Sequence, residues 1–81
     1  MSMVSSRDVQ EIVASILEVH VADVGIDASF SADLEMDSLH KTEFIVLLER
    51  ASGIEFTPAE AAEIDSVRDV MRMLSDRHRV S

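Results

Sequence analysis

The stretch that decides the fold is Leu34-Glu35-Met36-Asp37-Ser38-Leu39, which runs on into the apolar helical segment of residues 40–50. Asp37 is a good helix N-cap, because its carboxylate can accept backbone N–H bonds that the first turn leaves open. Ser38 then takes the first helical position, with its hydroxyl near solvent. A phosphate on Ser38 would be stabilised there, since helix N-termini attract anions. On its own, an Asp-Ser pair more often marks only an ordinary helix start.

A longer pattern around this pair points to a known family. The motif of acyl carrier proteins and related thiolation domains closely resembles Asp33-Leu34-x-x-Asp37-Ser38-Leu39-x-x-x-Glu43-Phe44-x-x-x-Leu48-Glu49. Two later segments keep the family's order and spacing: Gly53-Ile54-x-Phe56 and Ile64-x-Ser66-Val67-x-Asp69-Val70. The resemblance therefore covers residues 9–74.

This resemblance implies a covalent cofactor and a set of partner enzymes. Ser38 would carry a 4′-phosphopantetheine arm that a phosphopantetheinyl transferase attaches from coenzyme A, with Asp37 as the helix cap beside it. The thiol of the arm would hold acyl groups as thioesters for an acyltransferase, a ketosynthase or an acyl or aminoacyl ligase. The chain would then be a substrate of other enzymes and not an enzyme itself. The serine-hydrolase motif Gly-x-Ser-x-Gly is absent from the sequence.

Length and composition predict one small domain with an aliphatic core. The 81 residues are 47% hydrophobic but only 4% aromatic, which suits a single domain over residues 1–81 with an ordered core of about residues 7–77. There is no Cys and the three His lack ligand spacing, so we expect neither disulfides nor a metal site. The net charge of −9 disfavours nucleic acid and anionic membranes. Without a membrane-length apolar run or a signal-peptide pattern, we expect a cytoplasmic monomer.

Apolar periodicity predicts an all-α fold, a four-helix bundle with three longer helices and one short helix. The expected helices cover residues 7–20, 38–51, 58–64 and 67 to about 76–79. The short third helix starts with a capping box between Thr57 and Glu60, with Pro58 at its first position. The long connection over residues 21–35 should contain a helical turn near residues 29–33. Its spaced apolar side chains should hold it against the core: Val24, Ile26, Phe30 and Leu34.

The second helix is expected to present two faces when its residues are placed about 100° apart around the axis. The core face comprises Phe44, Leu47, Leu48 and Ala51. The other face carries the expected partner-binding residues Leu39, Glu43, Val46 and Arg50. An exposed apolar pair beside Ser38 favours a docking role for this face. Glu60 and Glu63 on the short third helix are further candidates for partner binding.

The sequence departs from the family pattern at positions around the second helix. Glu35 stands where Gly is common, which predicts a blunter or more acidic turn before Ser38. The helix that partners read is usually acidic near its start, but here it begins His40-Lys41. Lys41 should lay its stem along apolar surface with its ammonium outside. Ser52 replaces a large apolar residue, so the nearby core should be looser or filled by other side chains.

Several functions remain open at this level. Asp before Ser favours an acyl carrier over a peptidyl carrier. Arg greatly outnumbers Lys, and Ala and Val are plentiful, which suggests a GC-rich bacterial gene. These features favour a discrete carrier in polyketide or related specialised biosynthesis. A fatty acid synthesis carrier and an aminoacyl or peptidyl carrier are alternatives. An acidic helical interaction module without a cofactor would explain the charge and the helices, but not the joint occurrence of the motifs.

Overall fold

The computed structural model describes residues 4–79, with side chains as far as Asp76. The chain folds into four α-helices and one 3-10 turn: α1 (Ser6–Leu17), η1 (Val21–Asp23), α2 (Ser38–Ser52), α3 (Pro58–Glu63) and α4 (Val67–Arg79). Three longer helices and one short helix confirm the predicted all-α bundle. The predicted starts of α2 and α3 are also confirmed, since Asp37 and Thr57 are their N-caps.

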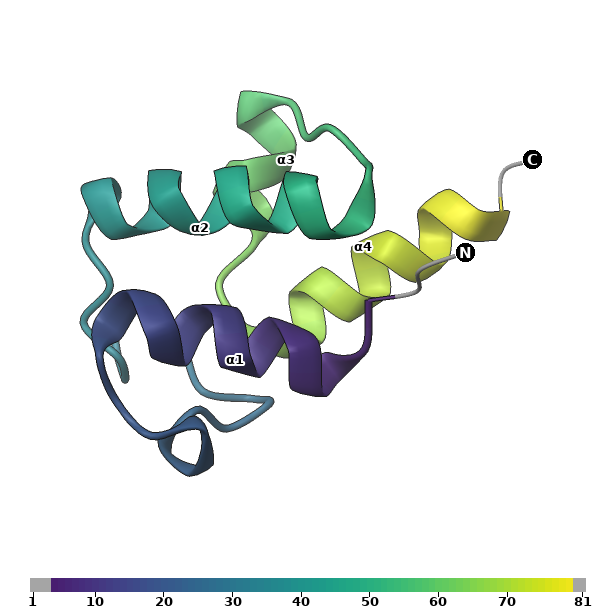
Figure 1. Cartoon of the computed structure of the whole chain (residues 1–81). Helices are drawn as coiled ribbons and strands as arrows, with labels where there is room; N and C mark the ends of the chain where they lie inside the picture. Colours follow the sequence, from purple (N-terminus) through teal and green to yellow (C-terminus); the bar gives the residue numbers. More distant parts are fainter. Residues whose placement is uncertain (1–3, 80–81) are drawn as a thin grey trace.

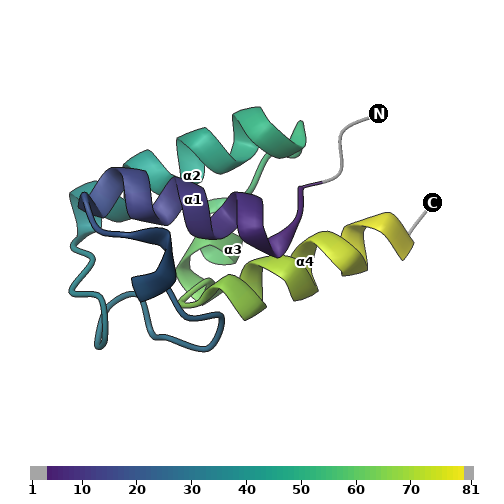
Figure 2. The ribbon, with the colours of Figure 1, turned by 60° about the horizontal axis from the view of Figure 1, so that its bottom comes forward.

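α1 and α2 lie side by side and run in opposite directions, and α4 runs obliquely from beside α1 towards the right of the view (Figure 1). α1 packs against both α2 and α4. In the turned view, the long connection between α1 and α2 comes forward (Figure 2). The molecule measures 35 × 24 × 20 Å. The start of α2 lies at one end of it, whereas the start of α1 and the end of α4 lie at the other (Figure 1).

The core is formed by the apolar stripes of the three longer helices together with the loops. Phe30 and Phe44 meet edge to face, with their ring centroids 5.2 Å apart. The largest fully buried side chains are Phe30, Phe44, Leu48, Ile64, Val9, Val13, Val24, Val67 and Val70. Aliphatic residues therefore supply most of the core, as the composition predicts.

α1 is shorter than its apolar spacing predicts. A capping box between Ser5 and Asp8 begins the helix. Glu18 adopts the left-handed conformation with φ 58°, and its N–H donates to the carbonyl of Ala14. The helix therefore ends at Leu17 and does not continue to residue 20. His20 is exposed and precedes η1, so it lies outside the helix in which the predicted range of residues 7–20 placed it.

The long connection before α2 is held against the core, although not by every residue expected. Val24 and Phe30 are each 1% exposed, but Ile26 is 38% exposed and does not serve as an anchor. The predicted turn is present, because the N–H of Asp33 donates to the carbonyl of Ser29 at 2.9 Å. Buried apolar anchors therefore alternate with solvent-exposed turns along this segment.

Asp65, in the link between α3 and α4, fastens the same connection from outside. Its carboxylate accepts bonds from the Ser29 hydroxyl and from both the N–H and the hydroxyl of Ser31. Its carbonyl accepts the N–H of Phe30 at 2.7 Å. The bond from Ser29 is the main cause of a lowered pKa at Asp65, aided by Ser31 and by the charge of Lys41 against the opposing effect of burial.

Arg68 fixes an earlier point of this connection. Its guanidinium pairs with Asp27, and its backbone N–H donates to the carbonyl of Ile26 at 3.0 Å. The hydrogen bond to Arg68 lowers the pKa of Asp27, and the same bond raises the pKa of Arg68. Both side chains are exposed, so this pair guides the path of the loop more than it adds to stability.

Candidate functional site

The site begins with the N-cap of α2. Asp37 is extended, with φ −88° and ψ −177°, and its Oδ1 accepts the N–H of His40 at 2.8 Å. Its carbonyl accepts the N–H of Lys41 at 2.9 Å. The N–H groups of Ser38 and Leu39 come before the first intrahelical bond and have no such partner. They present two backbone donors at the positive end of the helix dipole.

Ser38 is exposed at the first position of α2. Its carbonyl accepts the Thr42 hydroxyl at 2.9 Å, which closes the first turn. Among the described residues, no hydrogen bond engages the Ser38 hydroxyl. The oxygen is thus accessible, and a phosphate bound to it would lie beside the open N–H groups of Ser38 and Leu39. This geometry fits a phosphate-linked group on Ser38.

The turn before Ser38 depends on a strained residue and a buried one. Glu35 has φ 54°, in the left-handed region that Gly adopts without penalty. Met36 follows as a buried side chain, and its N–H donates to the carbonyl of Phe30 at 2.7 Å. The left-handed turn is therefore retained with Glu at this position, at a cost of about 1 kcal/mol.

Two basic residues, His40 and Lys41, stand in the first turn of α2, and both are partly shielded from solvent. His40 Nδ1 is shielded from solvent and lies 3.2 Å from Asp37 Oδ1, without hydrogen-bond geometry. Lys41 turns its ammonium inward, where it donates to the carbonyl of Ile64 at the end of α3. The expected outward ammonium is therefore wrong, because the C-cap of α3 offers an otherwise unpaired acceptor. Lys41 ties α2 to α3.

The α2 residues that are expected to bind partners are exposed, and their docking role stays a prediction. Leu39 is 66% exposed and Val46 is 43% exposed. Glu43 and Arg50 are exposed on the same helix. Two bare apolar side chains with charges beside them therefore follow Ser38 along α2.

The predicted core face of α2 is only half right. Phe44 and Leu48 are fully buried, but Leu47 is 37% exposed and Ala51 is also exposed. Both exposed residues line an open groove between α2 and α1, so helix α1 does not cover this part of α2. The Ser52 hydroxyl donates to the carbonyl of Leu48 at 2.8 Å, so a polar contact within α2 stands where the family pattern has a large apolar residue.

Glu60 and Glu63 are not brought together with the α2 face. Glu60 Oε1 accepts the N–H of Thr57 at 2.9 Å and so completes the capping box of α3. Glu63 lies at the end of α3 and lines a separate hollow of about 210 Å³ with residues of α4. A role for these two residues in partner binding stays a prediction.

Two other kinds of site are absent from the part of the chain that the structure describes. No three His, Asp or Glu side chains there are grouped so that they could hold a metal ion. No helix there is long and apolar enough to cross a membrane.

Comparison with known proteins identifies the family. A family model described as a phosphopantetheine attachment site matches residues 7–74. Polyketide-8 synthase acyl carrier protein 2 of Streptomyces avermitilis is 35% identical over 71 residues, which cover 88% of this chain and 82% of that protein. The acyl carrier proteins of Helicobacter acinonychis and Chlamydia trachomatis serovar D are each 37% identical over 70 residues, which cover 86% of this chain and 90% and 91% of theirs. This chain belongs to the acyl carrier protein family, and its prosthetic group is a covalently attached 4′-phosphopantetheine.

Proposed function

We propose that this chain is a discrete acyl carrier that holds its 4′-phosphopantetheine arm on Ser38 and serves polyketide or related specialised biosynthesis. The observation that carries the proposal is the exposed Ser38 at the capped start of α2, whose hydroxyl has no hydrogen bond to any described residue. The family match spans this position. An interaction module without a cofactor would need none of these features.

In this proposal, a phosphopantetheinyl transferase uses the Ser38 hydroxyl as the nucleophile. Its oxygen bonds to the phosphorus next to pantetheine, the pyrophosphate bond of coenzyme A breaks, and adenosine bisphosphate leaves. The serine proton passes to the transferase. The phosphodiester that results is an anion beside the N–H groups of Ser38 and Leu39, which stabilise it.

The chain's own residues hold the arm in place and do not take part in acyl transfer. The arm supplies a thiol that holds an acyl group as a thioester. α2 fixes the root of that arm at one end of the molecule, and a tethered acyl group reaches a docked enzyme at a high effective concentration. The chain therefore acts as a monomeric cytoplasmic substrate of its transferase and of acyl-transferring enzymes, and is not itself a catalyst.

The choice of pathway rests on one relative and on the start of α2. The polyketide relative from Streptomyces avermitilis and the departure from an acidic start at His40-Lys41 favour specialised biosynthesis. The relatives named only acyl carrier protein are equally similar, so fatty acid synthesis is the second candidate. A strain whose own fatty acid carrier can be switched off separates the two. We expect no rescue of growth by the modified chain, whereas rescue would favour fatty acid synthesis.

Attachment is tested by intact mass. With coenzyme A and a broad-specificity transferase, the parent should gain one phosphopantetheine, and Ser38→Ala should gain none while keeping its helical circular dichroism. Ser15→Ala, at another exposed serine on a helix, is the matched control and should be modified like the parent. Modification of Ser38→Ala, or none in the parent, would refute the assignment.

A further inference from the structure

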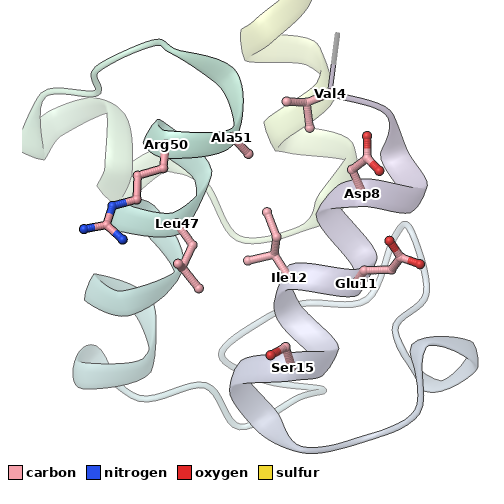
Figure 3. Close-up of a pocket in the computed structure, with 8 residues that line it drawn as sticks. All are labelled: Val4, Asp8, Glu11, Ile12, Ser15, Leu47, Arg50 and Ala51. Atoms are coloured by element: carbon pink, nitrogen blue, oxygen red, sulfur yellow. The ribbon is translucent and has the colours of Figure 1, made fainter. Parts of the chain in front are cut away.

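The two ends of α2 are connected to the rest of the molecule in different ways. Towards its end, α2 faces α1 across the open groove, where Ile12 points towards Leu47 and Ala51 (Figure 3). Around its start, residues 36–41 form hydrogen bonds with two other parts of the chain. These bonds lie within a few residues of Ser38, so they are the ones that act on its position.

The first half of these contacts is made by the backbone alone. The N–H of Met36, two residues before the helix, donates to the carbonyl of Phe30 at 2.7 Å. The N–H of Phe30 in turn donates to the carbonyl of Asp65 at 2.7 Å. The side chains of Phe30 and Met36 are both buried. The approach to α2 is therefore connected, through Phe30, to the link between α3 and α4.

The second half depends on one side chain. The Lys41 ammonium donates to the carbonyl of Ile64, the residue before Asp65. The N–H of Lys41 donates to the carbonyl of Asp37 at 2.9 Å, one turn earlier on α2. Asp37 directly follows Met36, so these hydrogen bonds and the peptide bonds between them close into a ring. We call it the Lys41 ring, and the first turn of α2 is part of it.

Lys41 is the one member of the Lys41 ring that contributes a side-chain bond. A substitution at Lys41 therefore opens the ring and leaves every backbone group in place. Ile64 is fully buried, and without Lys41 its carbonyl would lose its partner beside the core. Lys41 lies three positions after Ser38, and residues at this spacing are neighbours on a helix. The opening would thus occur in the turn that carries the Ser38 hydroxyl.

We infer that Lys41 is a positioning residue for the modification of Ser38, because the Lys41 ring holds the first turn of α2 in the orientation that presents the hydroxyl to the transferase. This inference rests on the proposed function. A transfer between two bound groups depends strongly on their alignment, so a small displacement of the attacking oxygen slows the transfer step. The ammonium is bonded inward, so Lys41 acts through the turn and not through a contact with the transferase.

Two other roles for Lys41 predict different kinetics. A cation that attracts the transferase or coenzyme A would change mainly KM, and the effect would weaken at high salt. A residue that only stabilises the fold would change the folded fraction, and the folded molecules would react at the parent's rate. A positioning residue lowers kcat of the folded protein. Steady-state kinetics therefore distinguish the three roles.

The kinetic test uses Lys41→Met, which keeps a long apolar stem and removes the donor. With the apo protein, coenzyme A and a broad-specificity transferase, we expect kcat per folded molecule to fall about fivefold. KM for the carrier should stay within about twofold of the parent's at both low and high salt. An unchanged kcat, or a raised KM alone that high salt abolishes, would overturn the inference.

Asp27→Asn is the matched control for this test. It weakens the pair between Asp27 and Arg68, which holds the same connection but lies outside the Lys41 ring. Its kcat should equal that of the parent. An equal fall in kcat for Asp27→Asn and Lys41→Met would show that any loosening of the connection slows the reaction, which would overturn the specific role of Lys41.

Amide hydrogen exchange tests the Lys41 ring directly. In the parent, the N–H groups of Phe30 and Met36 should be protected. In Lys41→Met, their exchange should accelerate about tenfold more than that of Val13 in α1. Equal acceleration at all three amides would indicate only a global loss of stability. Exchange of Met36 in the parent at the rate of an unfolded chain would show that the ring does not form in solution. Either result would overturn the inference.

Failure of the proposed function gives a different result from failure of this inference. If the parent gains no phosphopantetheine at Ser38, the proposed function fails. If the parent is modified and Lys41→Met reacts with the parent's kcat, the positioning role of Lys41 fails while the carrier function stands.

Discussion

Two regions of this molecule are built in opposite ways. The connection that leads to Ser38 has little regular secondary structure, yet Asp65 and Arg68 hold it with hydrogen bonds from outside the segment. The groove lies between two regular helices, yet within the described residues no hydrogen bond or ion pair joins α1 to α2. The connection that leads to Ser38 is thus fastened by polar contacts, whereas α1 and α2 meet through apolar packing.

The largest expected effect separates the buried and exposed sides of α2. Leu48→Ala removes a fully buried side chain and should lower the free energy of unfolding by roughly 2–5 kcal/mol. Leu47→Ala, one position earlier but in the groove, should cost less than about 1 kcal/mol. Urea unfolding of both variants measures the difference. Equal losses would mean that the groove is closed in solution.

The next effect tests how Asp65 fastens the connection. Asp65→Asn should lower the free energy of unfolding at pH 7 by about 1 kcal/mol, because the bonds from Ser29 and Ser31 lose their charged acceptor. A lowered folded-state pKa means that the stabilisation is present above the unfolded pKa of about 4 and disappears as pH falls through the folded value. The difference in the free energy of unfolding between the parent and Asp65→Asn should therefore shrink from pH 6 to pH 3.

Urea midpoints measured across this pH range provide the readout for Asp65. The control is Asp27→Asn, whose partner Arg68 is exposed. The difference in urea midpoint between Asp27→Asn and the parent should be smaller than that of Asp65→Asn at every pH. A gap for Asp65→Asn that stays constant between pH 6 and pH 3 would contradict the assignment.

A smaller effect of opposite sign is expected at the turn before Ser38. Glu35→Gly should stabilise the protein by up to about 1 kcal/mol, because Gly adopts φ 54° without strain. Gly53→Ala is the converse, since Gly53 has φ 73° at the C-cap of α2, and it should destabilise by about 1 kcal/mol. Thermal melting measures both. Destabilisation by Glu35→Gly would show that the Glu35 side chain stabilises the folded state by more than the backbone strain at φ 54° costs.

The smallest effect on stability should fall on the exposed face of α2. Val46→Ala should change the free energy of unfolding by less than about 0.5 kcal/mol, yet slow turnover by the partner ketosynthase. Glu43→Lys should slow it mainly at low salt, as expected for a charge at the rim of an interface. If Val46→Ala unfolds easily while its folded fraction reacts normally, Val46 belongs to the core and recognition lies elsewhere.

The bundle and its caps could be predicted because their signals are local. Asp37, the pair Thr57 and Glu60, and Gly53 each act within a few residues of their own position, so short motifs reveal them. The early end of α1 could not be predicted in this way, because Glu18 adopts a conformation that its residue type disfavours. Its left-handed turn carries no sequence signal.

The remaining errors concern contacts between distant segments. A helical wheel gives the direction of Leu47 and Ala51, but not whether α1 extends far enough to cover them. The inward turn of Lys41 depends on the position of Ile64, which is 23 residues later. The sequence pattern of one helix does not contain the distances between distant segments. Those distances decide which surfaces are exposed.

The opposite placement of the start of α2 and the free ends of α1 and α4 has a mechanical consequence (Figure 1). Suppose that the carrier is anchored by either of those ends, on a bead or as part of a larger fusion. The folded body then becomes a lever, because the start of α2, where the arm is proposed to attach, lies at the opposite end of a molecule 35 Å long. Small rotations at the anchor would sweep the cargo through a wide arc, so the whole carrier would add its own length to the reach of the arm.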